Sequence, residues 1–118
     1  MFDFEYKDPE LVRHMEENFP EMTEEFRRIC HEQYEVFCKK QHDYGKNNIL
    51  LGGEIDNEVD RRVALTGIVI RIADKSNRLL NLVLKNTTNS VEESVEDTLQ
   101  DLSNYGIIGQ IISRAKWR

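Results

Sequence analysis

The chain has 118 residues, of which 39% are hydrophobic and 32% are charged. This length and composition predict one small globular domain spanning residues 1–118. The 22 acidic residues outnumber the 16 basic ones, giving a net charge of −6. Because binding to a nucleic-acid backbone needs a basic surface, DNA and RNA polymers are not expected as partners. A small phosphorylated ligand bridged by a divalent cation is compatible with this charge.

The cysteines and the first residues predict a cytoplasmic protein. Cys30 and Cys38 would be separated by about 12 Å of rise on one helix, which exceeds the ~7 Å limit for a disulfide. We therefore expect two reduced thiols that are in the core or half-buried. The opening MFDFEYKDPEL is acidic and lacks the pattern of a signal peptide. No apolar run approaches the ~20 residues of a membrane span, so no membrane contact is expected.

The first twenty residues predict one short helix. Asp8 is a suitable N-cap, and Pro9 suits the first helical position. Apolar residues then recur every fourth position, at Leu11, Met15 and Phe19. Pro20 is expected to end this helix.

A second helix and a polar loop are predicted to follow. From about Thr23 to about Lys40, apolar residues recur at helical spacing. The next segment, HDYGKNNILLGGEID, covers residues 42–56 and is longer than the usual connection of ~2–8 residues. We expect it to be functional or to contain a short turn of helix. Gly45 permits a left-handed turn at the end of the second helix.

Two further helices are predicted in the remaining chain. The segment NEVDRRVALTGIVIRIADKSNRLLNLVLK, residues 57–85, is the most apolar. It predicts a central helix, or two helices that bend near Gly67. Ser90 and Glu93 form a capping box that opens the fourth helix. The sequence therefore predicts an all-α bundle of four main helices.

The third helix carries a basic face. Arg71, Asp74, Lys75 and Arg78 are spaced so that they share one side of a helix. Two arginines and a lysine in this arrangement can hold phosphate oxygens. The alternative is a solvated face with an internal Asp74–Arg78 pair.

The fourth helix carries an acidic face. Glu93, Asp97 and Asp101 are spaced by four, so that like charges stack and repel. A hard cation such as Mg²⁺ would remove this repulsion by binding the carboxylates. The alternative is a solvated acidic face near the start of the helix. Glu32 and Glu35 could supply further carboxylates, although such a pair is common on helices.

The stretch HDYGKNN combines several groups that suit recognition of a base and a sugar. Asp43 is an acceptor, Tyr44 an aromatic face, Lys46 a cation and Asn48 an amide. The alternative is a plain turn at the end of a helix. We find no arrangement for nucleophilic catalysis, no glycine-rich phosphate loop and no zinc pattern.

Three motifs, KKQHDYGKNN, IVIRIADKSNRLLNL and VEESVEDTLQDLSNYGII, together resemble a known family. In order and spacing they are similar to the nucleotide-modification-associated domain of the first type, a small all-helical domain found chiefly in phage and prophage genomes. The resemblance covers roughly residues 25–113. That family is similar to the MazG-like all-α nucleotide pyrophosphatases. These are usually dimers or tetramers that hold Mg²⁺ between acidic helices and hydrolyse nucleoside triphosphates to monophosphate and pyrophosphate.

The resemblance implies a role for each motif. The implied nucleotide contacts are Asp43, Tyr44 and Asn48, with Arg71, Lys75 and Arg78 at the phosphates. The implied metal ligands are Glu93, Asp97 and Asp101, and the implied catalytic carboxylates are Glu32 and Glu35. One departure stands out: the pyrophosphatases have Glu-x-x-Asp where this chain spaces its carboxylates by four. One residue rotates a helical side chain by about 100°, which changes the metal geometry.

Three functions follow as hypotheses. The first is a phage-type enzyme that hydrolyses a nucleoside triphosphate, or a modified one, with Mg²⁺ as cofactor in the host cytoplasm. The second is a nucleotide-binding module without hydrolysis, which delivers or sequesters a modified or signalling nucleotide. The third is a structural helical oligomer. A homo-oligomer, dimer or tetramer, is expected because the third helix has surplus hydrophobic surface.

Overall fold

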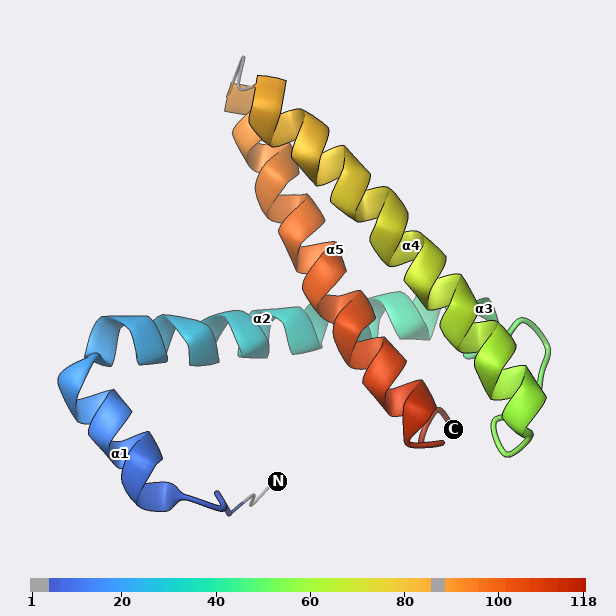
Figure 1. Cartoon of the computed structure of the whole chain (residues 1–118), viewed down its shortest axis with the longest axis horizontal. Helices are drawn as coiled ribbons and strands as arrows, with labels where there is room; N and C mark the ends of the chain where they lie inside the picture. The colour runs from blue at the N-terminus through green and yellow to red at the C-terminus, as the bar shows by residue number, and fades with distance from the viewer. Residues whose placement is uncertain (1–4, 86–88) are drawn as a thin grey trace. The chain divides into compact units, whose positions relative to one another are not determined.

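The computed structural model describes residues 5–85 and 89–118, and their side chains except those of residues 89–94. Within this part the chain is all-α, with five helices and no strand (Figure 1). The helices are α1 (Pro9–Asn18), α2 (Pro20–Tyr44), α3 (Asn47–Leu50), α4 (Glu58–Lys85) and α5 (Asn89–Ser113). The chain divides into two compact units, Met1–Val36 and Phe37–Arg118, and the boundary lies within α2.

The first unit contains α1 and the first part of α2. The predicted start of α1 is confirmed, because the Asp8 carboxylate accepts a hydrogen bond from the Leu11 N–H at 3.1 Å and Pro9 occupies the first turn. Helix α2 begins at Pro20, earlier than predicted, since a proline is well tolerated in the first turn. None of the hydrophobic residues described in this unit is buried.

The predicted loop after α2 is shorter than expected and contains a turn of helix. Helix α2 continues to Tyr44, where Gly45 takes a φ of 71° and donates its N–H to the Gln41 carbonyl at 2.9 Å. The left-handed turn predicted at Gly45 is therefore confirmed. Helix α3 follows at once and buries Ile49 and Leu50, so the short helical turn expected in this segment is also confirmed.

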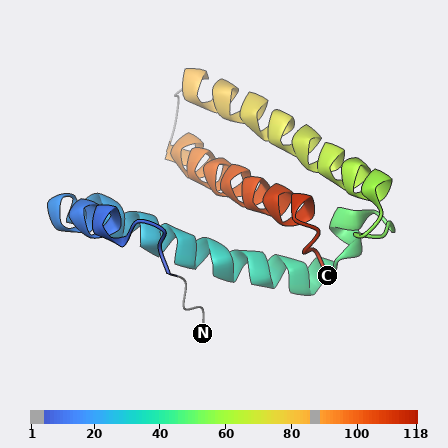
Figure 2. The same cartoon turned by 60° about the horizontal axis from the view of Figure 1, so that its bottom comes forward.

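Helices α4 and α5 lie side by side and run in opposite directions (Figure 2). Helix α4 is a single helix, which excludes the alternative of two helices at Gly67. The expectation that it is central was wrong, because only Ala64 and Ile68 are buried among its residues. Its contacts with α5 and α3 cover one side, while apolar residues such as Val63 and Ile70 remain more than half exposed.

The core lies in the second unit and draws on several elements. Its buried side chains are Ile49, Leu50, Ile55, Ala64, Ile68, Ile108, Ile112 and Trp117. They come from α3, the loop after it, α4, α5 and the segment that follows α5. Hydrophobic burial therefore joins α3 to the α4–α5 pair, and this fixes the side of α4 from which the candidate site is built.

A turn after α5 brings Trp117 back onto this core. Ala115 adopts a left-handed φ of 54°, and its N–H donates to the Ile112 carbonyl at 2.9 Å. The Lys116 N–H donates to the Ile111 carbonyl at 3.0 Å, which completes a Schellman motif. The indole N–H of Trp117 then donates to the Lys46 carbonyl at 3.2 Å.

Two other expectations concern the thiols and the membrane. Cys30 and Cys38 are free, as predicted, but both are exposed and neither is in the core. Among the helices of residues 5–85 and 89–118, none combines the length and apolar composition that a membrane span requires.

The packing of α5 makes a stability prediction. Ile112 is fully buried, whereas Ile107, on the same helix, is 47% exposed. We expect Ile112→Ala to lower the free energy of unfolding by about 2–5 kcal/mol, because it leaves a cavity in the core. Ile107→Ala is the matched control and should cost much less. Urea denaturation of both variants checks this, and equal losses would contradict the assignment of the core.

Candidate functional site

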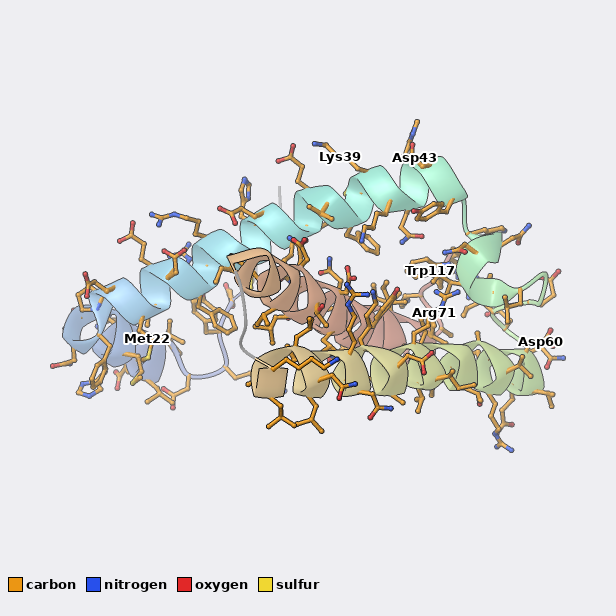
Figure 3. The ribbon with its side chains drawn as sticks, turned by 90° about the horizontal axis from the view of Figure 1, so that it is seen from above. Met22, Lys39, Asp43, Asp60, Arg71 and Trp117 are labelled. Carbon is orange, nitrogen blue, oxygen red and sulfur yellow. The ribbon has the colours of Figure 1, made fainter. Side chains whose placement is uncertain are left out.

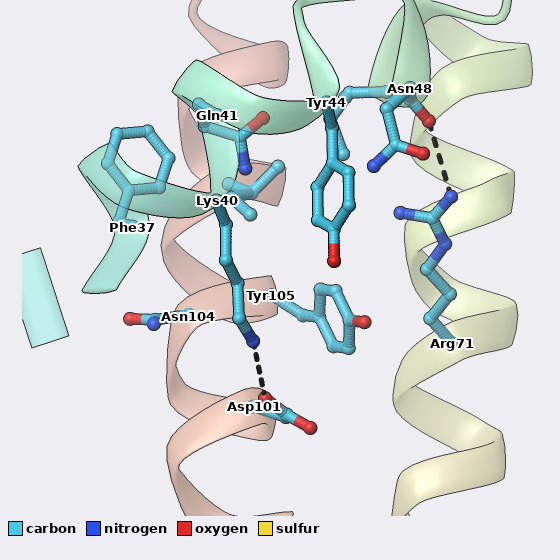
Figure 4. Close-up of a pocket in the computed structure, with 11 residues that line it drawn as sticks. Phe37, Lys40, Gln41, Tyr44, Asn48, Arg71, Asp101, Asn104 and Tyr105 are labelled. Atoms are coloured by element: carbon cyan, nitrogen blue, oxygen red, sulfur yellow. Dashed lines mark hydrogen bonds and ion pairs between the residues drawn. The ribbon is translucent and has the colours of Figure 1, made fainter.

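The second unit contains a small cavity between the end of α2, α3, α4 and α5 (Figure 4). Its volume is about 110 Å³. The residues that line it are Phe37, Lys40, Gln41, Tyr44, Asn48, Ile49, Arg71, Asp101, Asn104, Tyr105 and Ile108. We call it the Asp101 cavity. Aromatic rings, amides and charged groups from four helices meet here.

Asp101 binds two lysines from two other helices. One carboxylate oxygen accepts a hydrogen bond from the Lys40 ammonium of α2 at 3.2 Å. The other accepts from the Lys75 ammonium of α4 at 3.0 Å. The Asp101 side chain is 21% exposed, so this bridge is more shielded from water than an ordinary surface ion pair. It links α5 to both neighbouring helices.

The pKa of Asp101 reflects this arrangement. Burial alone would raise the pKa, because it disfavours the charged carboxylate. The hydrogen bonds and positive charges of Lys75 and Lys40 outweigh burial and hold the pKa below its ordinary value. Asp101 is therefore ionised at neutral pH, and its charge is committed to the two lysines.

Arg71 adds a third cation on the other side of the cavity. Its guanidinium donates to the Asn48 carbonyl at 3.2 Å and lies 5.9 Å from the centre of the Tyr105 ring. These two contacts orient the guanidinium, and the hydrogen bond uses one of its five donors. Figure 4 shows Arg71 and Lys40 on opposite sides of the rings of Tyr44 and Tyr105. Phosphate oxygens and carboxylates are the ligands that such donors prefer.

Positive charges outnumber negative ones among the charged groups in and beside this cavity. Lys40 and Arg71 line it with two positive charges and Asp101 with one negative charge, and Lys75 adds a third positive charge beside it through its bond to Asp101. These four groups therefore leave a surplus of two positive charges in a protein whose net charge is −6. Such a local surplus attracts a small anion and orients it.

The loop motif contributes some of its predicted residues to the cavity. Tyr44 and Asn48 line it, and Figure 4 shows the Tyr44 ring extending from the end of α2 toward Tyr105. Asp43 does not line it: its carboxylate is 74% exposed and lies 3.5 Å from the His42 ring. Figure 3 places Asp43 on the side of α2 that faces away from α4. A shift of one residue rotates a helical side chain by about 100°, which separates Asp43 from Tyr44.

The two predicted charged faces are only partly brought together. Arg71 and Asp101 line the cavity, and Lys75 binds Asp101 without lining the cavity itself. Arg78 and Asp97 are exposed and do not line it. The basic and acidic faces therefore meet through their middle members, and their outer members face solvent.

The remaining predicted residues lie elsewhere. Glu32 and Glu35 belong to the first unit and are exposed. Glu93 lies in α5, but its side chain is outside the described residues, as is the capping box predicted for Ser90 and Glu93. No group of three or more His, Cys, Asp or Glu that could hold a metal occurs among the described side chains.

Several cavity residues were not predicted from the sequence. Lys40, Gln41, Asn104 and Tyr105 all lie inside the motifs that carry the family resemblance. Helical spacing offered one signal, since Asn104 and Tyr105 follow Asp101 by three and four residues and share its face. Lys40 and Asp101 are 61 residues apart, so their pairing depends on tertiary packing alone.

The lowered pKa of Asp101 makes a prediction with a definite sign. An ionised carboxylate that is favoured in the folded state stabilises the fold above the ordinary Asp pKa of about 3.9. This stability is lost as the pH falls through the lowered pKa. Asp101→Asn should therefore unfold more easily than the parent chain at pH 7, and the difference should shrink in strong acid.

Urea denaturation at a series of pH values checks this prediction. Glu96→Gln removes an exposed charge from the same helix and controls for a general loss of negative charge. A difference between Asp101→Asn and the parent chain that stays constant from pH 7 into acid would contradict the Asp101–lysine pairing.

Comparisons with known proteins identify the family. No match is found among curated proteins or among solved structures. The family model of Nucleotide modification associated domain 1 matches residues 40–112, which is more than half of the chain. The match begins at Lys40 and includes Arg71, Lys75 and Asp101. This chain belongs to the Nucleotide modification associated domain 1 family.

Proposed function

We propose that this chain binds a nucleotide and holds one of its phosphate groups in the Asp101 cavity. The observation that carries the proposal is that Lys40 and Arg71 line one cavity from two helices, while Lys75 binds the Asp101 carboxylate that also lines it. The family, which is associated with nucleotide modification, supports a nucleotide as the source of that phosphate. This is the second of the functions expected from the sequence.

Each cation has a distinct part in this proposal. Arg71 offers a planar fork of donors that suits two phosphate oxygens. The two lysines are held by Asp101, which spaces them and limits their mutual repulsion. A phosphate that enters would receive bonds from the remaining ammonium donors, since each lysine has three.

The size of the cavity limits what it can enclose. Ligand pockets usually measure ~300–1,000 Å³, whereas this cavity measures about 110 Å³. A single phosphate group suits such a space better than a triphosphate. The sugar and base would then lie outside it.

Magnesium-dependent hydrolysis, as in the MazG-like pyrophosphatases, needs a different donor set. Both oxygens of Asp101 already accept bonds from lysines, and Asp97 is exposed. The described side chains include no carboxylate cluster. These residues therefore do not fit an Mg²⁺ site, and binding is the function that we propose. The MazG-like relationship and the phage origin stay predictions.

The proposal is tested at Arg71. Arg71→Ala should weaken binding of a nucleoside monophosphate by about tenfold to a hundredfold, because this is the usual effect of losing a hydrogen bond to a charged group. Arg62→Ala is the matched control, because Arg62 lies exposed on the same helix, 3.6 Å from Glu58. Titration calorimetry measures both affinities. Equal losses in the two variants would contradict a phosphate site at Arg71.

A second experiment on the parent chain distinguishes binding from hydrolysis. The parent chain is incubated with nucleoside triphosphates and Mg²⁺, or with a chelator, and the nucleotides are measured by mass spectrometry. We expect binding that survives the chelator and nucleotides that stay intact. Release of pyrophosphate that requires Mg²⁺ would instead establish the hydrolytic function.

We also propose that the chain self-associates as a dimer or tetramer. Large apolar side chains such as Phe26 and Leu84 are more than 70% exposed, and a second copy would bury such surface. Sedimentation equilibrium measures the mass. We expect a multiple of 13.9 kDa, and a monomer at every concentration would contradict self-association.

A further inference from the structure

A second and larger cavity lies in the same unit, at the turn that follows α5. Its volume is about 430 Å³, within the usual range for small-molecule sites. Phe37, Ile111 and Trp117 form apolar walls, and Lys46, Lys116 and Arg118 bring cations. We call it the Trp117 cavity.

The two cavities are neighbours. Phe37 and Gln41 line both of them, so a ligand in one lies against side chains that also face the other. All of these residues belong to the second unit. A nucleotide could therefore place its phosphate and its base on the two sides of the same pair of side chains.

Gln41, which lines both cavities, has a side-chain oxygen without a hydrogen-bond partner among the described residues. This atom, Oε1, is buried. Leaving such an acceptor unpaired in the interior is unfavourable. Because this atom is closed to solvent, a ligand N–H would satisfy it once the Gln41 amide turns toward the ligand, and ring or exocyclic N–H groups are what nucleobases present.

The walls of the Trp117 cavity suit a flat ring. The rings of Phe37 and Trp117 meet edge to face, with centroids 5.8 Å apart and planes at 76°. The Trp117 ring is held in place by burial and by its bond to the Lys46 carbonyl. Pre-positioned aromatic surface binds planar ligands at little entropic cost, and the lysines favour one that carries negative charge.

We propose that the Trp117 cavity is the base-binding subsite for the nucleotide whose phosphate lies in the Asp101 cavity, with Gln41 accepting a hydrogen bond from an N–H of the base. This inference rests on the proposed function. It specifies the ligand further: a nucleoside phosphate whose base offers an N–H donor, with its ring against Phe37 and Trp117.

The single tryptophan of the chain provides the readout. The parent chain is titrated with each common nucleoside monophosphate and, separately, with inorganic phosphate, while Trp117 fluorescence and heat are recorded. We expect at least one nucleotide to bind and to change the emission. Inorganic phosphate should give heat with much less change in emission, because it would reach the Asp101 cavity alone.

A filling substitution tests the location. Ile111→Phe adds volume at the wall of the Trp117 cavity, and Ile107→Phe places the same ring at an exposed position of α5. We expect Ile111→Phe to lower the affinity for the nucleotide by about tenfold or more and the affinity for inorganic phosphate by less than about twofold. Ile107→Phe should change neither.

A second pair of variants keeps the test informative if Ile111→Phe does not fold. Lys116→Ala removes a cation of the Trp117 cavity, and Arg114→Ala removes an exposed cation two residues earlier that does not line it. Only Lys116→Ala should weaken nucleotide binding. The inference is overturned if the nucleotide binds without changing Trp117 emission and all four variants bind it with the affinity of the parent chain. The proposed phosphate site would still stand in that case.

The opposite pattern would separate the two proposals. If Arg71→Ala leaves nucleotide affinity unchanged while Ile111→Phe or Lys116→Ala abolishes binding, the phosphate assignment fails and the base-binding subsite stands. If neither nucleotides nor inorganic phosphate bind, both proposals are overturned.

Discussion

The bridge from Asp101 to Lys40 and Lys75 is the interaction on which the site depends. It joins α5 to α4 and to the end of α2, and it holds two like charges near a third at Arg71. Without a carboxylate between them, these cations would repel one another. With it, they keep a surplus of positive charge in a fixed arrangement, which is the condition for a preorganised anion site.

The rest of the second unit supports this arrangement through hydrophobic packing. Ile68 of α4 and Ile108 and Ile112 of α5 are buried between the two helices that carry Lys75 and Asp101. Ile49 of α3 packs on the same core, and the Asn48 carbonyl beside it orients Arg71. The polar site and the apolar core are therefore built from neighbouring residues of the same helices.

The end of α5 adds a second constraint. Ala115 adopts a left-handed backbone conformation, which costs a non-glycine residue about 1–2 kcal/mol. The turn that this permits returns Trp117 to the core and to the carbonyl of Lys46. The helix start after Gly45 and the segment after α5 are thus tied together, and the larger cavity lies where they meet Phe37.

The sequence predicts the helices better than the site. Helices come from local signals, such as the cap at Asp8 and the glycine at position 45, and both are confirmed. The bridge at Asp101 is not local, because Lys40 lies 61 residues away. Spacing along one helix suggested a metal ligand for Asp101, whereas the structure pairs this carboxylate with lysines from two other helices.

Trp117 was not predicted to have a role for a similar reason. It lies beyond the last helical repeat, and only the left-handed turn at Ala115 directs it to the core. Tyr44 and Asn48, by contrast, flank a turn that the sequence does predict, and both line the Asp101 cavity. Local turn chemistry therefore predicted part of the site, and tertiary packing determined the rest.

The most direct test of this account observes the cations themselves. The side-chain nitrogens of Arg71, Lys40 and Lys75 are followed by NMR in ¹⁵N-labelled protein while a nucleoside monophosphate is added. We expect these three resonances to shift together and saturate, while that of the exposed Arg62 does not. Binding that shifts other charged side chains and leaves these three unchanged would contradict a phosphate site at the Asp101 bridge.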